Sequence, residues 1–336
     1  MESVHRIARH GRRAPLFIAA VAIFALAGCA GGSGTPTEPA SDVDPHAPEV
    51  SEITVAGYQN APTTPLAAAM NAGYGEEYGI NVELQVAENA PAMLAQIISG
   101  DVPIGQVNGF FSVPAVIEGA DVRVIGEVLR GKPGVQTVEV LPDSGIESVA
   151  DLEGKKVAVV GLNSGHQGRI AAAMIDAGAD PSKVDFVALG WAEMPAALEQ
   201  GTADAVVTIG PFQLQARNEL GSETILDLAD GPFAEFPDSQ WLVNGAWADA
   251  NPNALAAFQC AVVIRGQQLV TDDQDVYEDT LREYGFSEEA IAADVKVIFP
   301  AANKPAQIIP DIMYELGWID EPFDISTITV PLPDNC

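Results

Sequence analysis

The chain has 336 residues, 48% of them hydrophobic, and a formal net charge of −31. It is long enough for two packed lobes, and its acidity argues against a nucleic-acid-binding surface. The first 28 residues contribute +3, because four arginines outweigh one glutamate, so the remainder carries −34. Such a surface repels anionic lipid headgroups as well as nucleic acid and suits a soluble protein in a salty or cell-wall environment.

The N-terminus reads as a targeting segment. Arginines lead into the apolar stretch from Ala14 to Ala27, which is too short for a membrane-spanning helix and is followed by Gly28 and Cys29. This pattern resembles a bacterial lipoprotein signal peptide with its lipobox over residues 1–28. The resemblance implies cleavage before Cys29, lipidation of that residue and an extracytoplasmic protein anchored to the cell membrane. An ordinary secretory peptide is the alternative, and Arg12-Arg13 leaves general secretion and twin-arginine export both open.

Residues 29–51 join the lipidated cysteine to the first predicted strand. They are rich in Gly, Ser, Thr, Pro and acidic residues without apolar periodicity, which predicts a disordered tether with an exposed His46. Beyond it the chain has two cysteines, Cys260 and Cys336. Export to an oxidising compartment favours a disulfide between them over two free buried thiols.

Short apolar strands alternate with single helices from Glu52 onward, which predicts parallel pairing with right-handed crossovers. The strands expected in the first part of the chain cover residues 53–56, 81–87, 104–107 and 122–128. The helices between them cover residues 64–70, 90–99 and 112–117.

A second copy of this pattern follows. Its strands are expected at 157–160, 184–189 and 204–208, and its helices at 168–177, at 194–200 and from Pro211. After residue 245 long helices dominate, at 253–270, 273–284 and 305–316. The fold class is therefore α/β, with lobe 1 built from residues 52–134 and 244–336 and lobe 2 from 135–243.

Several catalytic motifs are missing from the sequence. After removal of the signal peptide only His46 and His166 remain, which is too few for a two-histidine zinc site. No phosphate-binding loop or nucleophile elbow occurs, and Gly161, Gly165 and Gly168 lack dinucleotide spacing. We therefore expect no metal, no cofactor and no enzymatic activity, although a serine triad could still recruit His166.

Small polar and aromatic residues gather where predicted strands end. In an open α/β sheet this edge binds ligands, since helix N-termini leave backbone N–H groups unpaired there. Each residue has another explanation, because Asn and Ser also cap helices and Trp also packs in cores. The candidates for ligand contact are Tyr58, Gln59, Asn60, Asn89, Asn108, Ser112, Ser164, His166, Trp191 and Glu193.

Three stretches carry a family resemblance. They run from Asp143 through Gly154 to Val159, from Glu193 through Asp204 to Phe212, and from Glu315 to Ile319. They resemble ABC-transporter substrate-binding proteins of the nitrate/sulfonate/taurine class, which include receptors for a thiamine pyrimidine precursor. The likeness implies a type II periplasmic-binding fold whose lobes close about a hinge on a small solute and then dock on a membrane permease.

The resemblance places the crossover strands near Val135–Leu141 and Ser239–Asn244 and supports the candidate contacts by position. This chain differs from the family pattern at Gly210, where many relatives have an aromatic or acidic residue. We expect a monomer that binds a sulfonate- or nitrate-like anion at helix N-termini, with Arg169 or His166 assisting. The alternative ligand is a heteroaromatic amine held by Trp191 and Glu193, unless Glu193 only caps its own helix.

Two other functions stay open. One is an enzyme on the same fold, since a thiamine-pyrimidine synthase is a relative, although its cysteine-rich iron motif has no counterpart here. The other is a receptor that serves a signalling partner instead of a permease.

Overall fold

The computed structural model describes residues 43–87, 89–234, 236–293 and 297–336. The expected signal peptide and Cys29 lie outside these residues. Within the described part of the chain, none of the helices combines the length and apolarity needed to cross a membrane.

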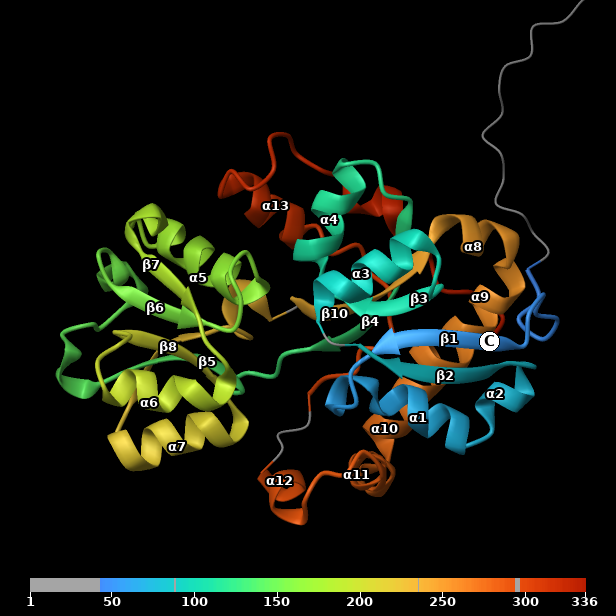
Figure 1. The fold of residues 1–336 in the computed structure, drawn as a ribbon, viewed down its shortest axis with the longest axis horizontal. Coiled ribbons are helices and arrows are strands. Elements are labelled where there is room, and N and C mark those ends of the chain that lie inside the picture. The colour runs from blue at the N-terminus through green and yellow to red at the C-terminus, as the bar shows by residue number, and fades with distance from the viewer. Residues whose placement is uncertain (1–42, 88, 235, 294–296) are drawn as a thin grey trace, which may run out of the picture. The chain divides into compact units, whose positions relative to one another are not determined.

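Two five-stranded sheets form the two lobes (Figure 1). The first sheet has the order β2-β1-β3-β10-β4 and the second has the order β7-β6-β8-β5-β9. The first sheet contains β1 (Glu52–Gly57), β2 (Asn81–Val86), β3 (Ile104–Val107), β4 (Val122–Arg130) and β10 (Pro237–Asn244). The second contains β5 (Gln136–Val140), β6 (Lys156–Val159), β7 (Asp185–Ala188), β8 (Ala205–Ile209) and β9 (Glu223–Asp227).

Most helices follow the predicted positions, but three short ones, Tyr74–Glu77, Gly245–Ala250 and Glu288–Ala293, were not expected. Those in the first part of the chain are α1 (Thr64–Asn71), α2 (Tyr74–Glu77), α3 (Ala90–Ser99) and α4 (Gly109–Ile117). The second lobe carries α5 (Gly165–Asp176), α6 (Met194–Glu199) and α7 (Gly210–Leu220). The last part of the chain forms α8 (Gly245–Ala250), α9 (Pro252–Phe258), α10 (Gln267–Asp272), α11 (Gln274–Glu283), α12 (Glu288–Ala293) and α13 (Ile308–Glu315). A π-helical segment, η7 (Gln259–Gly266), joins α9 to α10, so the helix expected over 253–270 is continuous but wound differently at its centre.

Alternating side chains of the strands build a separate core on each face of a sheet. In the first sheet, Trp241 and Val243 face the cluster that contains η7, whereas Leu242 faces the cluster that contains α3. In the second sheet, Val157 packs toward α5 and Ala158 toward α6. This period of two is what a strand buried on both faces requires, and it explains why these strands read as continuous apolar runs.

The two crossings between the sheets differ from the expected pattern of parallel pairing. The strand β5 runs antiparallel to β8 and β9, and β10 runs antiparallel to β3 and β4. The chain passes from β4 to β5 through residues 131–135 and returns between β9 and β10. Residues 237–243, expected in lobe 2, therefore belong to the first sheet, because β10 fills the place between β3 and β4.

The prediction of a disordered tether is wrong for residues 43–51, which pack on the first lobe. His46 is exposed, as expected, but its ring stacks on Tyr78 with the ring centroids 4.7 Å apart. The carboxylate of Glu49 accepts the N–H groups of Asn253 (3.1 Å) and Ala254 (2.9 Å), which lie in the first turn of α9. The composition of this segment, rich in proline and charged residues, gave no sign of the contact, because its partners lie more than 200 residues further along the chain.

The C-terminal segment connects both lobes. The helix α13 contacts α4 of the first lobe and α5 of the second. The helices α4 and α5 also meet closely, because a Cβ atom on Gly168 would lie 2.7 Å from the ring of Phe110. Finally, Cys336 forms the predicted disulfide with Cys260 of η7.

Candidate functional site

A cavity of about 680 Å³ lies between the two sheets at the carboxyl ends of several strands. Its walls come from the first lobe, the second lobe and both crossings. The lining residues are Tyr58, Asn60, Ala61, Pro62, Ala90, Gln106, Asn108, Phe111, Leu129, Val135, Gln136, Val160, Gly161, Ser164, Gly165, His166, Arg169, Trp191, Ile209, Asp238, Ser239, Phe286 and Val297. Most of these side chains are apolar or aromatic, as in pockets for organic ligands.

The first-lobe wall carries amide side chains that follow or belong to the strands. Asn60, two residues after Tyr58, has a buried Oδ1 atom without a hydrogen-bond partner, and the same is true of Oε1 of Gln106 on β3. The amide of Asn108, by contrast, has a hydrogen-bond partner on both its oxygen and its nitrogen. Its Oδ1 accepts the N–H of Phe110 at 2.9 Å, and its Nδ2 donates to the carbonyl of Asp238 at 2.7 Å.

The second-lobe wall is the first turn of α5. Ser164 precedes the helix in an extended conformation and is buried, yet its Oγ makes no hydrogen bond. Nε2 of His166 is likewise buried without a partner, and the ring packs edge-on against Trp191 with centroids 5.4 Å apart. Burial, assisted by the nearby charge of Arg169, lowers the pKa of His166 to about 3. The imidazole is therefore neutral at physiological pH.

Arg169 lies one turn further along α5 and is only 1% exposed. Its Nη2 contacts Asp238 Oδ1 at 2.8 Å and Gln136 Oε1 at 3.0 Å, while Nε donates to the carbonyl of Gly165 at 3.1 Å. Nη1 donates to the carbonyl of Leu228. Leu228 lies in the return crossing, and Gln136 and Asp238 lie in the strands next to the two crossings. Arg169 therefore connects the cavity wall to the segments that join the two sheets. It is an internal ion pair and not a free cation facing the cavity.

The local charge of the cavity differs from that of the whole chain. Among the lining residues, Arg169 and Asp238 are the charged side chains, and they pair with each other. The cavity is therefore close to neutral although the chain carries −31. Binding of an anion there would depend on the N-terminus of α5 and the unpartnered polar atoms beside it.

Six of the ten candidate contacts line the cavity, namely Tyr58, Asn60, Asn108, Ser164, His166 and Trp191. The other four have different places. Asn89 caps α3 by accepting the N–H of Ala92, and the carboxylate of Glu193 accepts the N–H of Gly190 at 2.8 Å, as the capping alternative predicted. Ser112 is buried within α4, and Gln59 is exposed.

Other lining residues were not among the candidates. Gln106 interrupts the apolar strand Ile104–Val107, and a glutamine at a fully buried strand position was a usable signal. Asp238 and Phe286 gave no such signal, since their place depends on the return crossing and on the last part of the chain. Within the described residues there is no group of three or more His, Cys, Asp or Glu side chains that could hold a metal ion.

The two sheets, their crossings and the cavity between them define a two-lobed protein of the periplasmic-binding fold. The chain belongs to the family described as NMT1/THI5 like, whose model matches residues 60–275. Among solved structures, the chain is similar to the periplasmic aliphatic sulphonate binding protein SsuA from Escherichia coli. The two share 20% identity over 85% of this chain and 94% of that one, with a TM-score of 0.67, which confirms the predicted fold.

Two curated relatives match over about 70% of their own length. A formylaminopyrimidine-binding protein of Halalkalibacterium halodurans is 26% identical over 260 residues, 76% of this chain and 74% of that protein. A taurine-binding periplasmic protein of Escherichia coli (strain K12) is 26% identical over 225 residues, covering 67% of this chain and 68% of that protein. These relatives are named as binding proteins and not as enzymes.

Proposed function

We propose that this protein is the extracytoplasmic receptor of an ABC importer and that it captures a small organic sulfonate in the cavity between its lobes. Ser164 carries this proposal. Its hydroxyl is buried without a partner at the N-terminus of α5, where unpaired backbone N–H groups favour an oxyanion. Burying a hydroxyl without a hydrogen-bond partner is costly, so the position of Ser164 is best explained by a ligand that forms the missing hydrogen bond.

The size and lining of the cavity favour a solute larger than nitrate. A volume of about 680 Å³ with mostly apolar walls suits a sulfonate that has an organic body, because an inorganic oxyanion would leave these walls without contact. The names of the similar sulphonate- and taurine-binding proteins support this ligand class.

A second ligand class has its own support. Oδ1 of Asn60 and Oε1 of Gln106 are hydrogen-bond acceptors without a partner, so they suit a solute with N–H groups. Trp191 offers an aromatic face in the same cavity. An amine-bearing heteroaromatic such as a formylaminopyrimidine meets these conditions. Glu193 does not take part in this version of the proposal, because its carboxylate caps its own helix.

Calorimetric titration with hexanesulfonate, taurine, nitrate and a formylaminopyrimidine tests the proposal. Hexanesulfonate should bind, and Ser164→Ala should weaken its binding roughly tenfold or more, since a hydrogen bond to a charged group is lost. Ser112→Ala is the matched control, because that serine is buried in α4 away from the cavity. If one of the four solutes is turned over, the protein is an enzyme instead.

The cellular setting is part of the same proposal. We expect a monomer, lipidated at Cys29 and held at the outer side of the cell membrane, that delivers its solute to a permease. Mass spectrometry of the mature N-terminus checks the anchor. An unmodified N-terminus at a residue other than Cys29 would show that the leader is an ordinary secretory peptide.

A further inference from the structure

The segment that follows α11 borders the cavity at its mouth. Phe286 lies in the loop between α11 and α12, lines the cavity and keeps 38% of its surface exposed. We refer to residues 284–293, comprising this loop and α12, as the strap. A large aromatic side chain that is exposed beside an apolar cavity gains contact when a solute fills the space next to it.

The strap is fixed to the first lobe next to the cavity. The hydroxyl of Tyr284 donates to the carbonyl of Thr63 at 3.0 Å, and Thr63 follows the lining residues Ala61 and Pro62. The N–H of Phe286 donates to the carbonyl of Leu281 at 3.1 Å. The beginning of the strap therefore holds Phe286 against the same wall that carries Asn60.

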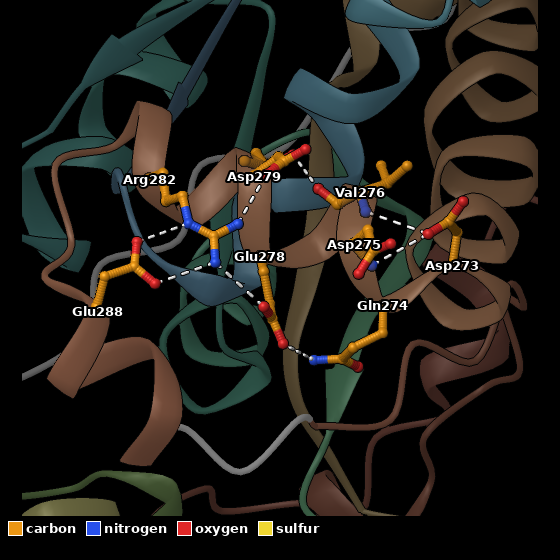
Figure 2. Close-up of polar contacts among 9 residues, drawn as sticks. Asp273, Gln274, Asp275, Val276, Glu278, Asp279, Arg282 and Glu288 are labelled. Atoms are coloured by element: carbon orange, nitrogen blue, oxygen red, sulfur yellow. Dashed lines mark hydrogen bonds and ion pairs between the residues drawn. The ribbon is translucent and has the colours of Figure 1, made fainter.

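Arg282 then fixes the far side of the loop. Its Nε and Nη2 atoms contact the two carboxylate oxygens of Glu288 at 2.7 and 3.1 Å (Figure 2). Nη1 binds Asp279 at 2.7 Å, and Nη2 lies 3.3 Å from Glu278. Because Arg282 precedes the loop and Glu288 begins α12, this bidentate contact connects the two ends of the loop that carries Phe286.

The strap also reaches the second lobe. The helix α12 contacts α7, whose first residue follows the lining residue Ile209. One element thus belongs to the first lobe, borders the cavity and touches the opposite lobe. Closure of the lobes about a solute would tighten all three contacts together.

On the basis of the proposed function, we propose that Phe286 is a specificity-determining residue, positioned by the Arg282–Glu288 contact, that covers the organic body of the bound solute and slows its release. The sulfonate head is held at α5, whereas the strap acts on the other end of the molecule. The strap therefore discriminates between long and short organic bodies and affects dissociation more than association.

Stopped-flow measurement of Trp fluorescence with hexanesulfonate tests this role. Phe286→Ala should raise the dissociation rate roughly tenfold and leave the association rate within about threefold, because the loss falls on the closed complex. It should also reduce the preference for hexanesulfonate over methanesulfonate. Arg282→Gln should raise the dissociation rate less, by roughly threefold, since Phe286 itself remains.

Arg123→Gln is the matched control. Arg123 makes the same bidentate contact with Asp249, at 2.6 and 2.9 Å, on the surface and away from the cavity lining. It should leave both rates unchanged. Equal effects of the Arg123 and Arg282 changes, or wild-type dissociation in Phe286→Ala, would overturn the inference while the receptor function stands. Failure of the wild-type protein to bind either sulfonate would overturn the sulfonate proposal and this inference with it.

Discussion

Two arginines of this protein each bind several oxygen acceptors but differ in their surroundings. Arg169 is 1% exposed and pairs with Asp238 among backbone carbonyls, whereas the side chain of Arg282 is 39% exposed among three carboxylates. Burial lowers the pKa of Arg169 and raises the pKa of Asp238, which disfavours both charged forms, and the attraction between the two side chains opposes these shifts. The contact with Glu288 instead raises the pKa of Arg282.

The difference indicates where each cluster acts. A buried pair that loses one partner leaves an uncompensated charge in a medium that solvates it poorly, so the fold depends on it. An exposed pair exchanges its partners for water and ions at little cost, so it can order a loop without controlling stability. Arg169 therefore holds together the segments that join the two sheets, and Arg282 orders the loop that carries Phe286.

The largest expected effect is that of Arg169→Met. It should lower the free energy of unfolding by about 3–5 kcal/mol, because Asp238 is left buried and unpaired. Urea denaturation followed by circular dichroism measures the change. Adding Asp238→Asn should restore part of the loss. A stability of Arg169→Met within about 1 kcal/mol of wild type would mean that the Arg169–Asp238 pair is not desolvated in solution.

The next effect concerns the pH dependence of stability. The pKa of His166 is about 3 in the folded protein and 6.5 in its ordinary state. Below pH 6.5 the unfolded chain therefore takes up a proton that the folded protein does not, so stability is full above that pH and falls as the pH decreases. Linkage predicts a loss of about 2 kcal/mol between pH 7.5 and 5.

Denaturation of His166→Asn at both pH values isolates this contribution from that of the carboxylates. The variant should lose less stability on acidification than the wild type. Identical losses in the two proteins would contradict a His166 side chain that stays neutral in the folded protein.

The smallest effect is that of Arg282→Gln on stability. A surface ion-pair network contributes roughly 1 kcal/mol or less, and salt screens it. The same urea experiment should show a small loss at low salt that disappears at high salt. A loss as large as that of Arg169→Met would show that exposure does not separate the two clusters.

Local patterns predicted most of the fold. The strand Ile104–Val107 and the helix Ala90–Ser99 agree with prediction at both ends, since apolar runs and a terminal glycine mark them. The strand β9 was missed because it is an edge strand with an exposed start, Glu223 and Thr224, and therefore little apolar signal.

The residues of the candidate site were predictable only where a position directly after a strand also lies in the cavity wall. Residues after strands, such as Ser164 and His166, line the cavity because the carboxyl ends of strands meet there. Asn89 and Glu193 occupy equivalent sequence positions, but their side chains are used by the nearest helix. Phe286 and Asp238 come from distant parts of the chain, and no periodicity indicates that they return to the cleft.

The disulfide between Cys260 and Cys336 closes the last part of the chain into a covalent ring that contains α11, the strap and α13. The C-terminal end of this ring is attached to a helix of the first-lobe core, so it cannot peel away residue by residue. A pulling force on the C-terminus would pass through the disulfide to Cys260, so it would not stretch the strap. Reduction would free that end, and the last residues of the chain would then be held to the first lobe by non-covalent contacts alone.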